Sequence, residues 1–188
     1  EKQFYEEKHN FPVHFVGHPL IDEISARTPV IPENFRKEHQ LDERPIIALL
    51  PGSRKQEIQK MLEIMLSVTP DFPDYQFVIA GAPSQDQDFY EPFLKKNRVH
   101  IVMNQTYNLL DVAHAALVTS GTATLETALF KVPEVVCYKG GRISYEIAKR
   151  VINLDYISLV NLIMDREVVK ELIQTEFNTK TLKKALAE

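Results

Sequence analysis

Short, uninterrupted apolar runs recur along the chain, and they constrain its fold more than any other feature. Each run holds four or five residues rich in Val, Ile and Ala, and most of them end at a turn residue. They occupy residues 13–16, 46–50, 76–80, 99–103, 115–119 and 134–138. Runs of this length are typical of strands that are buried on both faces of a parallel sheet. The pattern therefore predicts one sheet of parallel strands.

Helical spacing of apolar residues fills most intervals between these runs. In residues 54–68 the apolar side chains recur at intervals of three and four, at Ile58, Met61, Leu62, Met65 and Leu66. Further helices are predicted at 107–113, 122–130, 144–152, 167–174 and 179–187, and a charged, proline-containing connector at 24–45. The alternation predicts a doubly wound α/β fold with a mostly parallel, Rossmann-like sheet and right-handed crossovers.

Composition limits the classes of function. The 188 residues suffice for one well-packed domain, and the net charge of −4 makes nucleic acid a poor candidate partner. The one cysteine, Cys137, lies in an apolar run, where we expect a small core residue. The histidines show no spacing typical of a metal site, so we expect no metal and no cofactor. No apolar run approaches the roughly 18 residues that span a bilayer.

The loop at 51–54, Pro-Gly-Ser-Arg, follows the strongest strand run. In doubly wound sheets ligands bind beyond the carboxyl ends of the strands, where the strand order reverses. Gly52 allows the backbone to approach a ligand, and Ser53 is a candidate N-cap of the next helix. The forked guanidinium of Arg54 suits a diphosphate. The alternative is a surface arginine on a capped helix.

A second loop, Ser-Gly-Thr-Ala-Thr-Leu-Glu at 120–126, opens a helix directly after another strand run. Backbone N–H groups at Gly121, Thr122 and Ala123 would form an anion site at the positive end of that helix. The carboxylate of Glu126, one turn later, would accept hydrogen bonds from ribose hydroxyls. The alternative is a capping segment with a favourable acid. Neither a Walker A loop nor a dinucleotide-binding glycine fingerprint occurs.

Weaker candidates lie elsewhere along the chain. His18, in a Gly-His-Pro turn, would contact a phosphate or act as an acid, although a lone histidine more often has a structural role. Asn161 is predicted in a loop after a weak strand, with Gln174 further on. The Asn161 amide there would read a uracil edge or a sugar hydroxyl.

Five segments together resemble the lipid-A-disaccharide synthase family. They are FVGHPL at 15–20, LLPGSRKQEI at 49–58, TSGTATLE at 119–126, VPEVVCY at 132–138 and SLVNLI at 158–163. The resemblance implies a GT-B fold, in which two Rossmann-like domains enclose the active site, and makes this chain the C-terminal, donor-binding half. We accordingly expect a linker from a preceding domain at 1–12, the nucleotide-sugar domain at 13–178 and a C-terminal helix at 179–188.

The family's activity, carried over by resemblance, joins UDP-2,3-diacylglucosamine to 2,3-diacylglucosamine 1-phosphate with inversion and releases UDP. It uses no bound metal and acts at the cytoplasmic face of the inner membrane, with peripheral membrane contact. The general base and the lipid acceptor site are expected in the other domain, so this chain alone would bind UDP without turnover. The residues expected at the donor are His18, Ser53, Arg54 (also as leaving-group stabiliser), Gly121, Thr122, Ala123, Glu126, Asn161 and Gln174.

The sequence departs from the family pattern at one position, and several alternative functions remain open. Val160 stands where many family members have proline, which would loosen the loop at Asn161. The alternatives are another GT-B transferase or UDP-sugar epimerase, or a non-catalytic nucleotide-binding domain; the missing glycine fingerprint disfavours an NAD-binding domain. Membrane contact through Phe4, Tyr5, Phe11 or the helix around Tyr145 competes with packing of these aromatics inside the protein. A homodimer is a possible assembly.

Overall fold

A computed structural model describes residues 2, 4–97, 99–141 and 155–188. These residues form a six-stranded sheet in the order β3-β2-β1-β4-β5-β6, and all neighbouring strands run parallel. The strands are β1 (Ile46–Leu50), β2 (Gln76–Gly81), β3 (His100–Met103), β4 (Ala113–Thr119), β5 (Glu134–Tyr138) and β6 (Lys170–Ile173). The chain moves outward from β1 to β3, returns to the other side of β1 and continues to β6. The predicted doubly wound, parallel sheet is confirmed, and its order reverses between β1 and β4.

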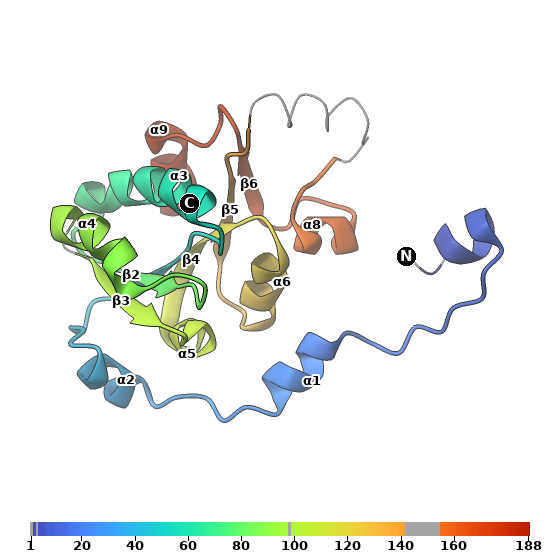
Figure 1. Cartoon of the computed structure of the whole chain (residues 1–188), viewed down its shortest axis with the longest axis horizontal. Coiled ribbons are helices and arrows are strands. Elements are labelled where there is room, and N and C mark those ends of the chain that lie inside the picture. The colour runs from blue at the N-terminus through green and yellow to red at the C-terminus, as the bar shows by residue number, and fades with distance from the viewer. Residues whose placement is uncertain (1, 3, 98, 142–154) are drawn as a thin grey trace.

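Helices cover both faces of this sheet (Figure 1), which explains the continuous apolar runs. Alternate side chains of β1 enter different cores. Ile47 and Leu49 pack with α3 (Lys55–Met65), α4 (Gln87–Asn97) and α9 (Thr179–Ala187). Ile46 and Ala48 pack with α2 (Pro32–Glu38), α5 (Thr106–Val112) and α6 (Thr122–Leu129). A short helix, α8 (Leu159–Met164), contacts α6.

The strand predicted at 13–16 is wrong. These residues lie in an irregular stretch between η1 (Phe4–Lys8) and α1 (Pro19–Ser25), and the side chains of Phe15 and Val16 are 80% and 93% exposed. Figure 1 shows this N-terminal segment extending away from the sheet. An apolar run forms a strand only where a neighbouring strand takes up its backbone hydrogen bonds, and this run has no such neighbour among the described residues.

The other five apolar runs form strands whose bounds agree within two residues. The weak strand predicted before Asn161 is wrong, because residues 155–158 lead into α8 without forming a strand. Some of the helix predictions are confirmed and others are not. The helices predicted at 107–113, 122–130 and 179–187 are confirmed, and 54–68 forms α3 followed by the 3₁₀ segment η2 (Leu66–Asp71). The helix predicted at 167–174 is wrong, because residues 170–173 pair with β5 as β6. The connector at 24–45 contains α2, and α1 and α4 were not predicted. The helix predicted at 144–152 lies outside the described residues.

The C-terminal helix packs on this domain. Leu182 of α9 is fully buried in the core beside α3, and the Thr179 and Ser67 hydroxyls are 2.7 Å apart. None of the helices in the described ranges is long and apolar enough to cross a membrane. The division of the chain at residues 12 and 178 stays a prediction.

Candidate functional site

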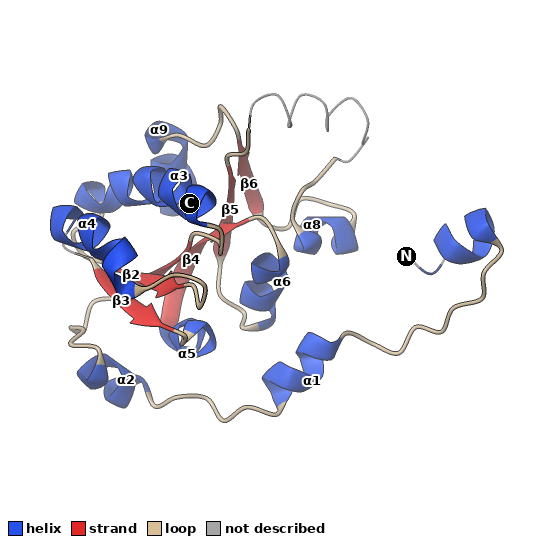
Figure 2. Cartoon of the chain, viewed as in Figure 1, coloured by secondary structure: helices blue, strands red, loops and turns tan. Residues whose placement is uncertain are grey.

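A cavity of about 270 Å³ opens at the carboxyl ends of β1, β2 and β4, where the strand order reverses. Figure 2 shows the loops that leave the strands there. We call it the switch-point cavity. Its lining comes from the two loops predicted to bind a ligand and from the loops after β2 and β3: Leu50, Pro51, Gly52, Ser53, Glu57, Ala80, Ala82, Pro83, Thr106, Thr119, Ser120, Gly121, Thr122, Ala123 and Glu126. The sheet topology thus brings the two loops together.

The loop after β1 depends on its glycine. Gly52 has φ +103°, and a Cβ atom there would collide with the carboxylate of Glu57. The Ser84 hydroxyl donates a hydrogen bond of 2.6 Å to the Ser53 carbonyl, which ties this loop to the loop after β2. The N-cap residue of α3 is Arg54, without a side-chain cap, so the prediction of Ser53 as N-cap is wrong.

Arg54 lies beside the switch-point cavity and lines a neighbouring one of about 440 Å³. Glu57 lines both cavities. The second cavity also receives Lys55 and Lys60 from α3 and Lys139 from the end of β5. The arginine side chain is exposed, and it joins a group of cations next to the loop at 51–53.

The loop after β4 leads directly into α6. Gly121 is the N-cap residue of that helix, and Gly121, Thr122 and Ala123 line the switch-point cavity. The first N–H groups of a helix lack intrahelical partners and form an anion site. The Thr119 hydroxyl oxygen, in the same lining, is buried and has no hydrogen-bond partner among the described residues. The cavity therefore offers polar groups that a bound anion or sugar would satisfy.

Glu126 contributes a carboxylate to this cavity from the second turn of α6. One of its oxygens accepts a hydrogen bond of 2.8 Å from the Tyr107 hydroxyl in α5. Burial, and next the Glu126 carboxylate, raise the pKa of Tyr107. The hydroxyl consequently remains a donor at neutral pH.

Asn161 lies in α8 and is fully buried, so its predicted place in a loop is wrong. The amide oxygen accepts from the backbone N–H groups of Val168 and Val169, at 2.7 and 3.0 Å. The amide nitrogen donates to the Val169 carbonyl at 2.9 Å and to Glu171 at 2.8 Å. These four bonds use the amide's donors and acceptors, and they hold the segment before β6 firmly although Val160 replaces the proline.

Gln174 and His18 lie outside the lining of the switch-point cavity. Gln174 follows β6 with φ +53°, and its backbone N–H donates to the Tyr138 carbonyl at 2.8 Å. The buried Nε2 of Gln174 has no hydrogen-bond partner within the described ranges. His18 is the exposed N-cap of α1, where its Nδ1 accepts from the Leu20 N–H at 3.3 Å.

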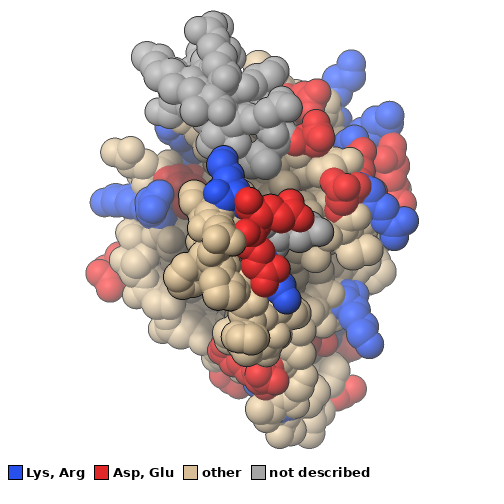
Figure 3. Space-filling view, turned by 90° about the vertical axis from the view of Figure 1, so that its right-hand side faces the viewer, with Lys and Arg blue, Asp and Glu red and all other residues tan. Residues whose placement is uncertain are grey.

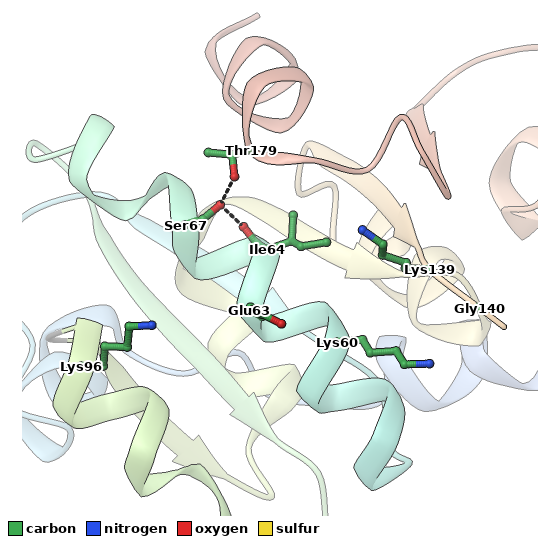
Figure 4. A pocket seen from close by; sticks show the side chains of 8 residues that line it. All are labelled: Lys60, Glu63, Ile64, Ser67, Lys96, Lys139, Gly140 and Thr179. Carbon is green, nitrogen blue, oxygen red and sulfur yellow. Dashed lines mark hydrogen bonds between the residues drawn. The ribbon is translucent and has the colours of Figure 1, made fainter. Parts of the chain in front are cut away.

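A larger cavity, of about 630 Å³, lies on the α3 and α9 side of the sheet (Figure 4). We call it the lysine cavity, because Lys60, Lys96 and Lys139 reach it from three separate elements. Its lining includes Lys139 and Gly140 from the loop after β5 but neither of the loops at 51–54 and 120–126. On the face shown in Figure 3, acidic and basic side chains are interspersed. Within the described ranges no three His, Cys, Asp or Glu side chains cluster as metal ligands do.

Sequence reasoning missed Tyr107 and Thr106, which reach the site from the start of α5. Thr106 and Tyr107 follow the end of β3 by three and four residues, since β3 ends at Met103. No short motif contains them, because Tyr107 and Glu126 are 19 positions apart and meet only through the sheet topology. A signal was nonetheless present: a loop after a parallel strand next to β2 belongs to the ligand edge of the sheet.

Comparison with known proteins adds independent findings. The family model described as lipid-A-disaccharide synthetase matches residues 1–188. A lipid-A-disaccharide synthase of Coxiella burnetii (strain Dugway 5J108-111) is 39% identical over 182 residues, covering 94% of this chain and 47% of the relative. One from Alcanivorax borkumensis is 36% identical over 190 residues, covering 97% of this chain and 49% of the relative. The chain spans about half the length of the curated relatives it matches.

Solved structures with low sequence identity share the fold. E. coli ADP-heptose LPS heptosyltransferase II aligns with a TM-score of 0.53 at 12% identity, covering 94% of this chain and 53% of that chain. UDP-GlcNAc 2-epimerase from Methanocaldococcus jannaschii aligns with a TM-score of 0.51 at 16% identity, covering 84% and 42%. At these identities the likeness concerns the arrangement of strands and helices alone.

Proposed function

Because the chain belongs to the lipid-A-disaccharide synthetase family, we propose that it forms the nucleotide-sugar donor site of a lipid-A-disaccharide synthase. The donor is UDP-2,3-diacylglucosamine, the acceptor is 2,3-diacylglucosamine 1-phosphate, and UDP is released with inversion at the transferred sugar. One observation carries the proposal. The switch-point cavity holds the start of α6 and the Glu126 carboxylate, which are complementary to a phosphate and a ribose, in one lining.

The diphosphate lies at the start of α6 in this proposal. The N–H groups of Gly121, Thr122 and Ala123 bind its oxygens. Ser53 and the Thr119 hydroxyl, for which the described residues offer no partner, add polar contacts. Negative charge grows on the diphosphate as the sugar departs. Preorganised donors and the nearby Arg54 guanidinium stabilise that charge, which lowers the barrier to transfer.

Glu126 binds the ribose hydroxyls, and the other proposed donor residues act around the cleft. Asn161 holds the segment that leads into β6, so its contribution is indirect. The buried Nε2 of Gln174, which has no partner in the part of the chain that the structure describes, supports a contact between this residue and the donor. Within this chain His18 acts as the N-cap of α1. A contact between His18 and the donor would form only in the longer protein.

Inverting transfer also needs a base that deprotonates the acceptor hydroxyl. We place that base, and the acceptor site, in the part of the protein beyond this half-length chain. Transfer takes place at the cytoplasmic face of the inner membrane. Peripheral contact with that membrane would use aromatic side chains of the N-terminal segment, where Phe4, Tyr5 and Phe11 are 51%, 45% and 61% exposed.

The test is calorimetric titration of the chain with UDP, beside a Glu126→Ala variant. We expect saturable binding by the natural chain and a loss of at least about tenfold in the variant, because ribose hydroxyls would lose a charged acceptor. A Glu91→Ala variant is the control, since Glu91 pairs with Lys95 on the surface of α4. Absence of UDP binding up to millimolar concentration, or equal binding by the Glu126 variant, would overturn the proposal.

A further inference from the structure

Tyr107 occupies a position between two cavities. Its neighbour Thr106 lines both the switch-point cavity and a cavity of about 340 Å³, which Tyr107 itself lines with Arg27, Pro83, Asn104, Gln105 and Asn108. The tyrosine is half-buried, and its hydroxyl lies 2.8 Å from one Glu126 oxygen. A carboxylate can only accept, so the phenol donates this bond.

The ring of Tyr107 is itself held in place. The Arg27 guanidinium lies 5.3 Å from the ring centroids of both Tyr107 and Phe130, and these two rings are 5.2 Å apart. Arg27 also donates to the Asn108 side-chain oxygen at 2.7 Å and pairs with Asp111 at 3.3 Å. A cation that lies against two rings and is anchored at two polar groups limits the movement of the Tyr107 ring.

The hydrogen bond from Tyr107 limits the conformational freedom of the Glu126 side chain. A Glu side chain has three rotatable bonds, and ordering it costs conformational entropy that a binding event must otherwise supply. The bond from Tyr107 fixes one carboxylate oxygen before any ligand arrives and leaves the other oxygen available. A phenol is protonated at neutral pH, and burial raises the pKa of Tyr107 further, so the donor is retained throughout the neutral range.

We propose that Tyr107, held by Arg27, is a positioning residue that orients the Glu126 carboxylate toward the ribose hydroxyls of the nucleotide, and that it thereby makes the site select ribonucleoside over 2′-deoxyribonucleoside diphosphates. The inference rests on the proposed function, since it needs a nucleotide at Glu126.

The experiment measures the dissociation constants of UDP and 2′-deoxy-UDP by calorimetry. The natural chain is compared with Tyr107→Phe, which removes only the hydroxyl, and with Glu126→Ala. We expect Tyr107→Phe to weaken UDP binding about tenfold and to change 2′-deoxy-UDP binding less than about threefold, so the ratio of the two constants falls. Tyr75→Phe is the matched control, because Tyr75 precedes β2 at the opposite end of the sheet.

The outcomes separate the two proposals. If Tyr107→Phe leaves the ratio of the two dissociation constants unchanged, or binds UDP more tightly, the positioning role is overturned. The proposed donor site still stands in that case, provided that Glu126→Ala weakens UDP binding. A natural chain that does not bind UDP overturns both. Thermal unfolding of Tyr107→Phe is measured beside the titrations, and retained 2′-deoxy-UDP binding is a second sign that the fold is kept. Equal weakening of both nucleotides in a folded variant would also contradict the inference.

Discussion

Glu126 in α6 and Asn161 in α8 both lie in segments that resemble the family, and their side chains meet opposite surroundings. Glu126 lines a cavity, and among the described residues its carboxylate has one hydrogen bond, from Tyr107. Asn161 is fully buried, and four hydrogen bonds within the protein occupy its amide. The comparison separates residues that present groups to a ligand from residues that fix the backbone around it.

Of the substitutions considered, Asn161→Ala should lower the free energy of unfolding the most. A small effect would contradict the structural role of Asn161. We expect a loss of about 2–4 kcal/mol in the free energy of unfolding, because the N–H groups of Val168 and Val169 and the Glu171 carboxylate lose buried partners. Urea unfolding measures this loss. Glu126→Ala is the matched control, with an expected change below about 1 kcal/mol. Equal losses in the two variants would contradict the distinction.

Glu134 is a useful contrast with Asn161, because it is also a buried polar residue but has no hydrogen-bond partner among the described residues. Burial raises its pKa from 4.5 to about 8. The folded state thus binds this proton more tightly than the unfolded chain, so its stabilising contribution is complete below pH 4.5 and is lost as pH rises through about 8. A Glu134→Gln variant, which cannot ionise, should be more stable at pH 7 by about 1–3 kcal/mol.

Urea unfolding at a series of pH values tests this. The difference between Glu134→Gln and the natural chain should grow from pH 5 to pH 8 and shrink towards acid. A difference that is constant across this range would mean that Glu134 keeps an ordinary pKa in the folded protein.

Gly52→Ala should have a smaller effect on stability and a specific one on the site. Gly17 and Gly52 both have positive φ, at +93° and +103°, but only at Gly52 would a Cβ meet another side chain, that of Glu57. We expect Gly52→Ala to lower the free energy of unfolding by about 1–2 kcal/mol and to weaken UDP binding. Gly17→Ala should leave UDP binding unchanged. Equal UDP affinity in both variants would contradict the role of the loop at 51–53.

The core of the sheet was predictable from the sequence because burial on both faces leaves a continuous apolar run. β1 shows this most directly, since all five of its residues are buried. β6 was not predictable, because only Leu172 of its four residues is buried and the charged Lys170 and Glu171 hide the strand pattern. The run at 13–16 has strand-forming residues, yet strand formation depends on a partner that local sequence does not reveal.

The parts of the candidate site that lie in one short stretch of sequence were predictable. Gly52 and the segment at 121–126 follow buried strands, and the rule for parallel sheets places both at one edge. The partners of Glu126 and Asn161 were not predictable, since Tyr107 and Glu171 approach them through tertiary structure. A motif thus identified the residues but not the direction in which their side chains point.

The central claim is that the nucleotide binds in the switch-point cavity, and backbone amide NMR with added UDP tests it most directly. The account predicts that UDP shifts the amide resonances of Gly52, Gly121, Thr122 and Ala123, and that Glu126→Ala reduces these shifts at equal UDP concentration. Shifts confined to residues of the lysine cavity, such as Glu63, Lys96 and Thr179, would contradict it.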